Sequence, residues 1–145
     1  KAYMDAYFAT FPGVRRYMDA VVEQARETGY VETLFHRRRD LPELSSSNRN
    51  LRAFGERVAL NMPIQGTAAD IMKLAMIAVW KGLRETIPEA RLVLQVHDEL
   101  IVECPEEQAE AVAQLLTEKM EHVVSLAVPL TADAHWGKNW LEAKG

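Results

Sequence analysis

The sequence contains one cysteine, no long apolar run, no internal repeat and no low-complexity tract. Cys104 cannot form an internal disulfide and lies in an apolar, strand-like stretch, so we expect a structural thiol in a reducing compartment. No run approaches the roughly 18 apolar residues of a membrane-spanning helix, and the first residues lack a signal-peptide pattern. The sequence therefore predicts a soluble, cytoplasmic protein with no membrane partner.

Composition excludes disordered and collagen-like proteins. Of the 145 residues, 48% are hydrophobic and 26% are charged, which is ordinary for a globular domain. The chain starts at Lys1, without an initiator methionine, and runs at once into an amphipathic stretch. We therefore expect one domain or an excised piece of one.

Charge is distributed unevenly along the chain. Residues 30–60 hold six arginines against four acids, whereas residues 87–145 hold eleven acids against four lysines or arginines. The overall charge of −4 argues only weakly against nucleic acid, because a basic segment can lie apart from an acidic site.

The first half of the chain reads as two helices around a strand and a basic turn. Apolar residues recur at helical spacing over 14–28, and Gly29 marks a stop. The stretch 30–35 has strand composition and leads into a basic turn at 36–39 and a loop at 40–48. A second helix is expected from 50 to 60, with a kink or break at Pro63.

The second half alternates helices and strands. Thr67 and Asp70 resemble a capping box that starts a buried central helix over 71–83. Strands at 92–97 and 100–104 are joined by a turn at Asp98 and Glu99, and Pro105 precedes a helix over 106–126 with an apolar stripe. A strand at 128–134 and a short Trp-containing segment complete an α+β fold.

Two adjacent carboxylates interrupt the apolar run "LVLQVHDELIVEC". Alternation along the strand places Val93, Gln95 and His97 on one face. Asp-Glu suits a two-residue hairpin turn poorly, and such violations of local rules concentrate at functional sites.

Such a turn offers the hard oxygen ligands that Mg²⁺ prefers when it binds substrate phosphates. The plainer alternative is a solvated acidic turn in which His97 makes a structural hydrogen bond. A two-metal site needs carboxylates from more than one element, and the sequence offers no clear second cluster, since Asp70 reads as a cap. If the metal site is real, a further ligand lies outside this chain.

Arg57, Asn61 and Gln65 are spaced four residues apart, which on a helix aligns them along one edge. With Gln95 and His97 they form a row of hydrogen-bond donors suited to the minor groove of DNA, where every base pair presents an acceptor. Taken singly, each could instead pair locally, cap the helix or be merely exposed. Basic residues that suit phosphate contact, or alternatively a solvated face, are Arg37, Arg38 and Arg39.

Four longer motifs decide between these alternatives. In order along the chain, they are "YVETLFHRRRDLPEL", "ERVALNMPIQGTAADIMKLAM", "LVLQVHDELIVEC" and "VPLTADAHWGKNW". This series resembles the C-terminal part of family A DNA polymerases, the bacterial DNA polymerase I type, over essentially the whole chain. The resemblance implies an antiparallel palm sheet with a catalytic hairpin packed against helices, plus helices of the fingers. Residues about 1–62 would be mostly fingers and the entry to the palm, and about 63–145 mostly palm.

The same resemblance implies roles for individual residues. Asp98 matches a ligand of two catalytic Mg²⁺ ions, and Glu99 matches its supporting neighbour. The five-residue donor row matches positions along the primer–template minor groove, and the arginine triplet lies in a segment that approaches the DNA backbone. Implied partners are primer–template DNA, deoxynucleoside triphosphates and the upstream remainder of the polymerase domain.

The sequence lacks the family's "DYSQIELR"-like motif, which carries another metal-binding aspartate, and its "RxxxKxxxFGxxYG"-like triphosphate-binding helix. We therefore expect the isolated chain to be inactive. The alternatives are a nuclease built on the same turn, a non-catalytic DNA-binding module, and a structural fragment that dimerises through exposed apolar surface.

Overall fold

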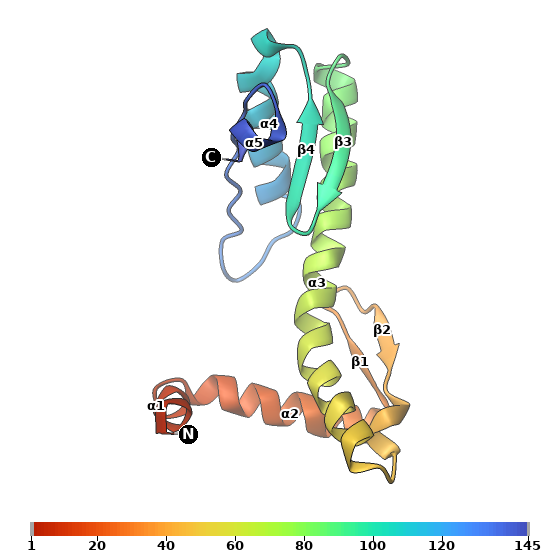
Figure 1. Ribbon diagram of the computed structural model, residues 1–145. Helices are drawn as coiled ribbons and strands as arrows, with labels where there is room; N and C mark the ends of the chain where they lie inside the picture. The colour runs from red at the N-terminus through yellow and green to blue at the C-terminus, as the bar shows by residue number, and fades with distance from the viewer. Residues whose placement is uncertain (1, 145) are drawn as a thin grey trace. The chain divides into compact units, whose positions relative to one another are not determined.

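The computed structural model describes residues 2–144, with the side chain of Ala2 left out, and divides into two compact units, Lys1–Ala69 and Asp70–Gly145. Its elements are helices and two small antiparallel sheets, which confirms the expected α+β class (Figure 1). Within the described residues no helix is both long and apolar enough to cross a membrane.

The first unit contains two helices and a hairpin before the start of a long helix. Helix α1 (Ala2–Thr10) precedes α2 (Pro12–Thr28), which ends where Gly29 adopts a φ of 83° and donates a hydrogen bond to the Ala25 carbonyl, as the sequence predicted. Strand β1 (Tyr30–Glu32) pairs with β2 (Arg38–Asp40), and a 3₁₀ turn follows at Pro42–Ser45.

The first strand is shorter than predicted, and the basic triplet belongs largely to a strand instead of a turn. The Thr33 hydroxyl accepts hydrogen bonds from the backbone N–H groups of Phe35 (3.2 Å) and Arg37 (3.2 Å). His36 adopts a φ of 62°. This local bonding competes with the strand ladder and ends β1 after Glu32.

The core of the first unit lies where α2, the hairpin and the start of α3 meet. The buried residues are Ala25, Val31, Leu41, Leu44 and Ala59, and the partly buried residues packed against them are Val21, Val22, Val58 and Met62. The predicted buried face of α2 is thus confirmed for its C-terminal half, whereas Val14 and Tyr17 are exposed.

Helix α3 (Arg49–Thr86) is continuous, so the break expected at Pro63 is wrong. Proline removes one backbone donor, but tertiary packing of the preceding turn, through Ala59 and Met62, holds the helix together. The capping box is wrong for the same reason. Thr67 lies inside the helix, and its hydroxyl donates to the Pro63 carbonyl.

In the second unit the end of α3 packs with the hairpin of β3 (Arg91–Val96) and β4 (Glu99–Glu103) and with α4 (Ala109–Glu121) (Figure 1). A 3₁₀ turn at Glu106–Gln108 leads into α4, which is shorter than predicted but buries the expected stripe. The buried core is Val79, Leu83, Ile87, Ala90 and Val112, and the residues packed against it are Leu92, Leu100, Val102, Cys104, Leu115, Leu116 and Met120.

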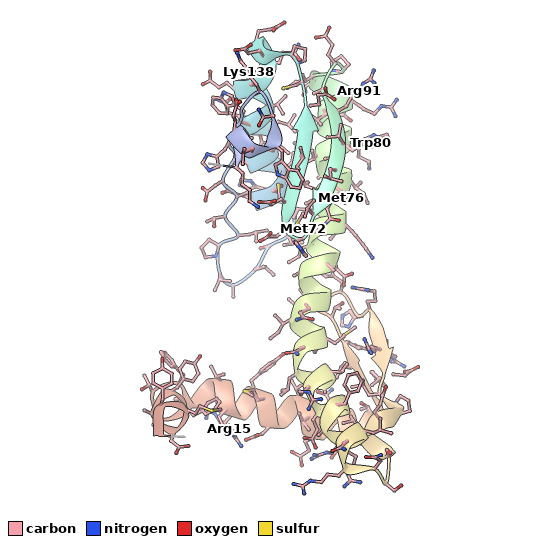
Figure 2. The ribbon with its side chains drawn as sticks, viewed as in Figure 1. Arg15, Met72, Met76, Trp80, Arg91 and Lys138 are labelled. Carbon is pink, nitrogen blue, oxygen red and sulfur yellow. The ribbon has the colours of Figure 1, made fainter. Side chains whose placement is uncertain are left out.

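The helix segment predicted as central and buried is buried on one side only. Ala75, Val79 and Leu83 are buried, whereas Trp80 is 48% exposed and Ile77 52% exposed. Figure 2 shows Met72, Met76 and Trp80 spaced along α3, as a four-residue interval on a helix requires. The guanidinium carbon of Arg84 lies 4.8 Å from the centre of the Trp80 ring.

The strand predicted at 128–134 is absent from the described residues, where this stretch has neither helix nor strand. Pro129 lacks a donor, and the backbone N–H of Ala132 bonds to the Glu121 carboxylate (3.0 Å) instead of to a strand. The Trp-containing terminus forms α5 (Trp140–Ala143), capped by the Asn139 side chain.

Candidate functional site

The hairpin turn is formed by His97 and Asp98, one residue earlier than predicted, because Val96 pairs with Glu99 at the ends of the two strands. His97 has a φ of 51°, and Asp98 has no positive φ. This order of signs is that of a type II′ turn, whose first central position usually holds glycine. An imidazole-bearing residue therefore occupies a position that favours glycine, directly before the carboxylate of interest.

A bulge changes which side chains share a face of the hairpin. Leu92 pairs with Val102, but Leu94 pairs with Ile101, so Val93 is an extra residue in β3. Leu92 packs in the core, whereas Leu94 is 44% exposed. Leu92 and Leu94 therefore lie on opposite faces, and the simple alternation expected along this strand is wrong at Val93, because one inserted residue reverses it.

Asp98 is exposed at the turn, and Glu99, the first residue of β4, is partly buried. Within residues 2–144 no group of three or more His, Cys, Asp and Glu side chains could hold a metal ion. The turn can thus offer hard carboxylate oxygens to a cation, and a complete site requires further ligands.

Beside Asp98, the Gln95 amide folds back on the turn. Its Nε2 donates to the backbone carbonyl oxygen of His97 at 2.6 Å. The predicted donor row along the DNA therefore contains one member whose amide also bonds within the hairpin.

The other members of the row lie together in the first unit. Because α3 continues through Pro63, Arg57, Asn61 and Gln65 remain on one face of the helix, and all three are exposed. They line one side of an open cleft of about 410 Å³, to which strand β2 contributes Arg39. The cleft thus gathers two guanidinium groups and two amide side chains over an apolar floor that includes Phe54.

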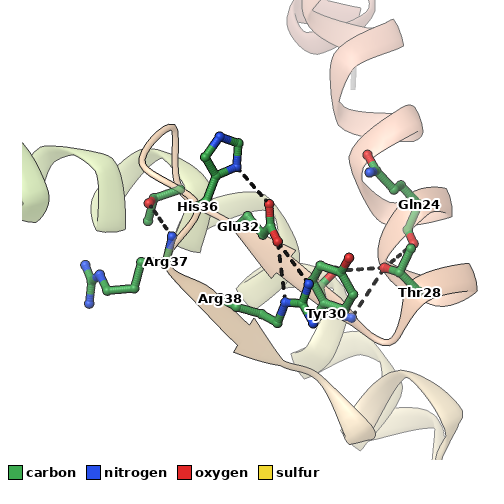
Figure 3. A network of polar contacts seen from close by, with 8 residues as sticks. Gln24, Thr28, Tyr30, Glu32, His36, Arg37 and Arg38 are labelled. Atoms are coloured by element: carbon green, nitrogen blue, oxygen red, sulfur yellow. Dashed lines mark hydrogen bonds and ion pairs between the residues drawn. The ribbon is translucent and has the colours of Figure 1, made fainter.

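The three arginines of the basic triplet have three different environments. Arg37 Nη2 donates to the Gly66 carbonyl (3.1 Å) in α3. Arg38 bonds to the Glu32 carboxylate (3.3 Å) and stacks 3.6 Å above the centre of the Tyr30 ring, as Figure 3 shows. Arg39 lies on the opposite face of β2 and reaches the cleft.

The β1–β2 loop is attached to the middle of α3. Thr67 Oγ1 accepts a hydrogen bond from the backbone N–H of Leu34 (3.0 Å), beside the Arg37 contact. A Cβ atom on Gly66 would lie only 2.7 Å from Cγ2 of Thr33. Glycine at this position therefore permits the close approach that holds the loop, and Arg39 beyond it, next to Gln65.

The outer face of the hairpin carries a small ionic network (Figure 3). The Glu32 carboxylate bonds to His36 Nδ1 (3.2 Å) and to the Arg38 guanidinium. The hydrogen bond from His36, followed by those from Arg38, holds the pKa of Glu32 below its usual range. Glu32 remains ionised at neutral pH and keeps Arg38 against the hairpin.

Comparison with known proteins decides the family. The family model described as DNA polymerase family A matches residues 1–142. The chain belongs to DNA polymerase family A. The resemblance inferred from the four sequence motifs is thereby confirmed.

Similar proteins of this family include DNA polymerase I of Geobacillus stearothermophilus, 54% identical over 142 residues, and that of Bacillus subtilis, 52% identical over 143 residues. These alignments cover 98% and 99% of this family A chain but only 16% of each relative. A solved structure, the POL domain of Pol1 from M. smegmatis in complex with DNA primer-template and dNTP, is 47% identical with a TM-score of 0.96. The match covers 26% of that solved chain and 100% of this chain.

Three residues that line the cleft were not predicted as site residues from the sequence. Phe54 lines it together with Arg57, whose guanidinium lies 6.0 Å from the ring centre, and helical spacing from Arg57 could have pointed to it. Gly66 admits the loop, and its neighbours in the sequence give no direct signal of that contact. Met62 lies between Asn61 and the proline, where a break was expected.

Proposed function

We propose that this chain forms part of the catalytic domain of a template-directed DNA polymerase, which adds deoxynucleotides to a primer 3′-hydroxyl. In the reaction the primer 3′-oxygen bonds to the α-phosphorus of the triphosphate, and pyrophosphate leaves. Membership of family A supports the proposal. In this chain, the observation that supports the proposal is the exposed Asp98 carboxylate on a two-residue turn between paired strands.

We further propose that residues about 1–62 contribute mostly to the fingers and the entry to the palm, and residues about 63–145 mostly to the palm. The chain divides into its two compact units close to this boundary, between Ala69 and Asp70. In this proposal the cleft residues belong with the substrate-approaching part of the domain, and the β3–β4 hairpin is the catalytic hairpin of an antiparallel palm sheet.

The donor chemistry at the turn fits Mg²⁺. Carboxylate oxygens are its preferred protein ligands, and Mg²⁺ binds through one or two carboxylates while keeping waters and substrate phosphates. Asp98 would be the direct ligand of two ions, and Glu99 would support it. When bound, the ions would neutralise negative charge at the attacking and leaving oxygens. The remaining ligands would come from outside the described residues, which offer no group of three.

Contacts with primer–template DNA are assigned to the donor residues. Arg57, Asn61 and Gln65 would donate hydrogen bonds to minor-groove acceptors, which are present at every base pair whatever the sequence. His97 would approach the groove from the hairpin, and the Gln95 amide, which bonds to the His97 carbonyl, lies beside it. Such contacts read the shape of a base pair, as a polymerase that copies any template requires.

The arginine triplet is assigned to the DNA backbone, with unequal contributions. Arg39 is exposed in the cleft, whereas Arg38 is paired with Glu32 and stacked on Tyr30. Replacing Arg39 by alanine should weaken DNA binding. It should also reduce the slope of the logarithm of the binding constant against the logarithm of the salt concentration by about one, as the loss of one phosphate contact requires. Arg38→Ala is the matched control and should change both quantities less. Fluorescence anisotropy at several salt concentrations measures them, and equal effects would contradict the assignment.

The isolated chain is proposed to be inactive, because Asp98 and Glu99 lack companions able to complete a metal site within residues 2–144. A second candidate function is DNA binding without catalysis, which the donor-lined cleft supports. Asp98→Ala distinguishes the two. DNA affinity should be unchanged in both cases, but synthesis by a complete polymerase that contains this chain should be abolished only if the turn takes part in chemistry.

Primer extension tests the proposal in a chimera, in which this chain replaces the 142 matched residues of Geobacillus stearothermophilus DNA polymerase I. We expect the chimera to extend a primer with Mg²⁺ and four deoxynucleotides, the Asp98→Ala chimera to fail, and the free chain to fail. Asp133→Ala, which removes an exposed aspartate outside the hairpin, is the matched control and should extend normally. Extension by the Asp98→Ala chimera would refute the proposal.

A further inference from the structure

The turn before Asp98 is held in a conformation that its sequence does not favour. His97 has a φ of 51°, where a residue with a Cβ is disfavoured and glycine is not. The strand ladder ends at the Val96–Glu99 pair, so it does not fix the peptide groups within the turn. Some other contact is needed to select one orientation of these peptide groups.

Gln95 supplies such a contact. Its Nε2 donates a 2.6 Å hydrogen bond to the backbone oxygen of His97, two residues ahead. That oxygen belongs to the peptide group joining His97 to Asp98, and a peptide group is planar, so the plane also contains the nitrogen and Cα of Asp98. Fixing the oxygen therefore fixes the rotation of this plane and, with it, the positions of the nitrogen and Cα from which the Asp98 side chain departs.

We propose that Gln95 is a positioning residue. It holds the His97–Asp98 peptide so that the Asp98 carboxylate would be presented in one orientation to Mg²⁺ and the triphosphate. This inference rests on the proposed polymerase function. This role differs from the one predicted from the sequence pattern, in which Gln95 contacts the minor groove of DNA. As a positioning residue it acts through the backbone of the turn.

The two roles predict different consequences for the same substitution. A groove contact contributes to DNA binding, so losing it raises the dissociation constant for primer–template. A turn contact contributes to the geometry of Asp98, so losing it raises the Mg²⁺ concentration needed for half-maximal rate. Residues that orient metal ligands typically contribute 10- to 100-fold to metal affinity or activity.

The first test is structural and needs no activity. Gln95→Met keeps the length of the side chain and removes the amide donor, and Gln114→Met makes the same change at an exposed glutamine of α4. Backbone NMR of the 145-residue chain should show His97 and Asp98 leaving their single conformation in Gln95→Met only. Unchanged His97 and Asp98 signals in Gln95→Met would overturn the proposal.

The second test uses single-nucleotide incorporation in the chimera. Gln95→Met should lower kcat and raise the half-maximal Mg²⁺ concentration about tenfold, with the DNA dissociation constant unchanged. In a His97→Gly background, where positive φ is unstrained, the same substitution should have a smaller effect. Weakened DNA binding with an unchanged Mg²⁺ requirement, and an equal effect in both backgrounds, would overturn the proposal.

These outcomes separate the inference from the proposed function. If Asp98→Ala abolishes incorporation while Gln95→Met behaves as the unsubstituted chimera, the turn is catalytic and Gln95 does not position it. If Asp98→Ala incorporates nucleotides normally, the proposed function itself fails, and the NMR result alone then describes a structural hydrogen bond.

Discussion

Gly66→Ala tests whether the close approach of the β1–β2 loop to α3 is required. The new Cβ would lie 2.7 Å from Thr33 Cγ2, a separation at which one of the two groups must move. Alanine in place of glycine stabilises a helix interior by about 1 kcal/mol, whereas overpacking at a tight contact costs about 1–3 kcal/mol. We therefore expect a net loss of about 1 kcal/mol in the first unit.

Two further variants isolate the contact. Gly82 lies in the same helix, but a Cβ there would meet only the side-chain ends of Lys119 (3.3 Å) and Leu115 (3.4 Å), so Gly82→Ala should be neutral or stabilising by up to about 1 kcal/mol. Thr33→Ser removes Cγ2 and keeps the hydroxyl that accepts the loop hydrogen bonds. In that background Gly66→Ala should become stabilising.

Native-state hydrogen exchange measures these effects in each unit separately, since it reports the free energy of opening amide by amide. The amide of Leu34 is the direct reporter, because it donates to Thr67 across the contact. If Gly66→Ala stabilised the intact chain as much as Gly82→Ala does, the steric account of the loop contact would be wrong.

Three other perturbations follow from burial and charge. Leu83→Ala should destabilise the second unit by about 2–5 kcal/mol in urea unfolding, because Leu83 is buried. Ile77→Ala, at an exposed position, should cost about 0.5 kcal/mol. Equal losses would contradict the assigned core. Because hydrogen bonds from an imidazole and a guanidinium lower the pKa of Glu32, its contribution to stability is present above its ordinary value of about 4.3 and is lost as pH falls through the lowered pKa. The stability difference between the chain and Glu32→Gln should therefore shrink in acid, and a difference independent of pH would refute this. Burial, with a smaller effect from a nearby glutamate, raises the pKa of the Cys104 thiol, so a disulfide reagent at pH 8 should react more slowly with the folded chain than with the urea-unfolded chain. Equal rates would show that the thiol is accessible.

Much of the fold follows from local patterns in the sequence. Gly29 ends α2 because glycine accepts the left-handed conformation at a helix C-terminus, and the apolar stripe of α4 is the one buried in the second unit. The shared helix face of Arg57, Asn61 and Gln65 was also predictable, since a four-residue interval places residues on one face of any helix.

The failures arise where tertiary contacts override local signals. Pro63 predicts a break, but packing around Ala59 and Met62 keeps α3 continuous. The turn lies one residue earlier than predicted, and Val93 forms a bulge, because pairing with β4 sets the register. Alternation along a single strand cannot reveal either feature.

The site was only partly predictable for the same reason. The motif predicts Asp98 as a candidate metal ligand, but the left-handed φ of His97 and the Gln95 hydrogen bond depend on the three-dimensional turn. Likewise the sequence groups three arginines, and only the register of β2 separates Arg39 from the paired Arg38.

The rate constant for adding one nucleotide, measured by rapid quench in the chimera with saturating primer–template and triphosphate, tests the central claim most directly. If Asp98 is a ligand of the catalytic ions, Asp98→Ala should lower this rate constant by more than about 100-fold, since even outer-shell partners of metal sites contribute 10- to 100-fold. DNA affinity should stay unchanged. A rate constant within about threefold of the unsubstituted chimera would contradict the account.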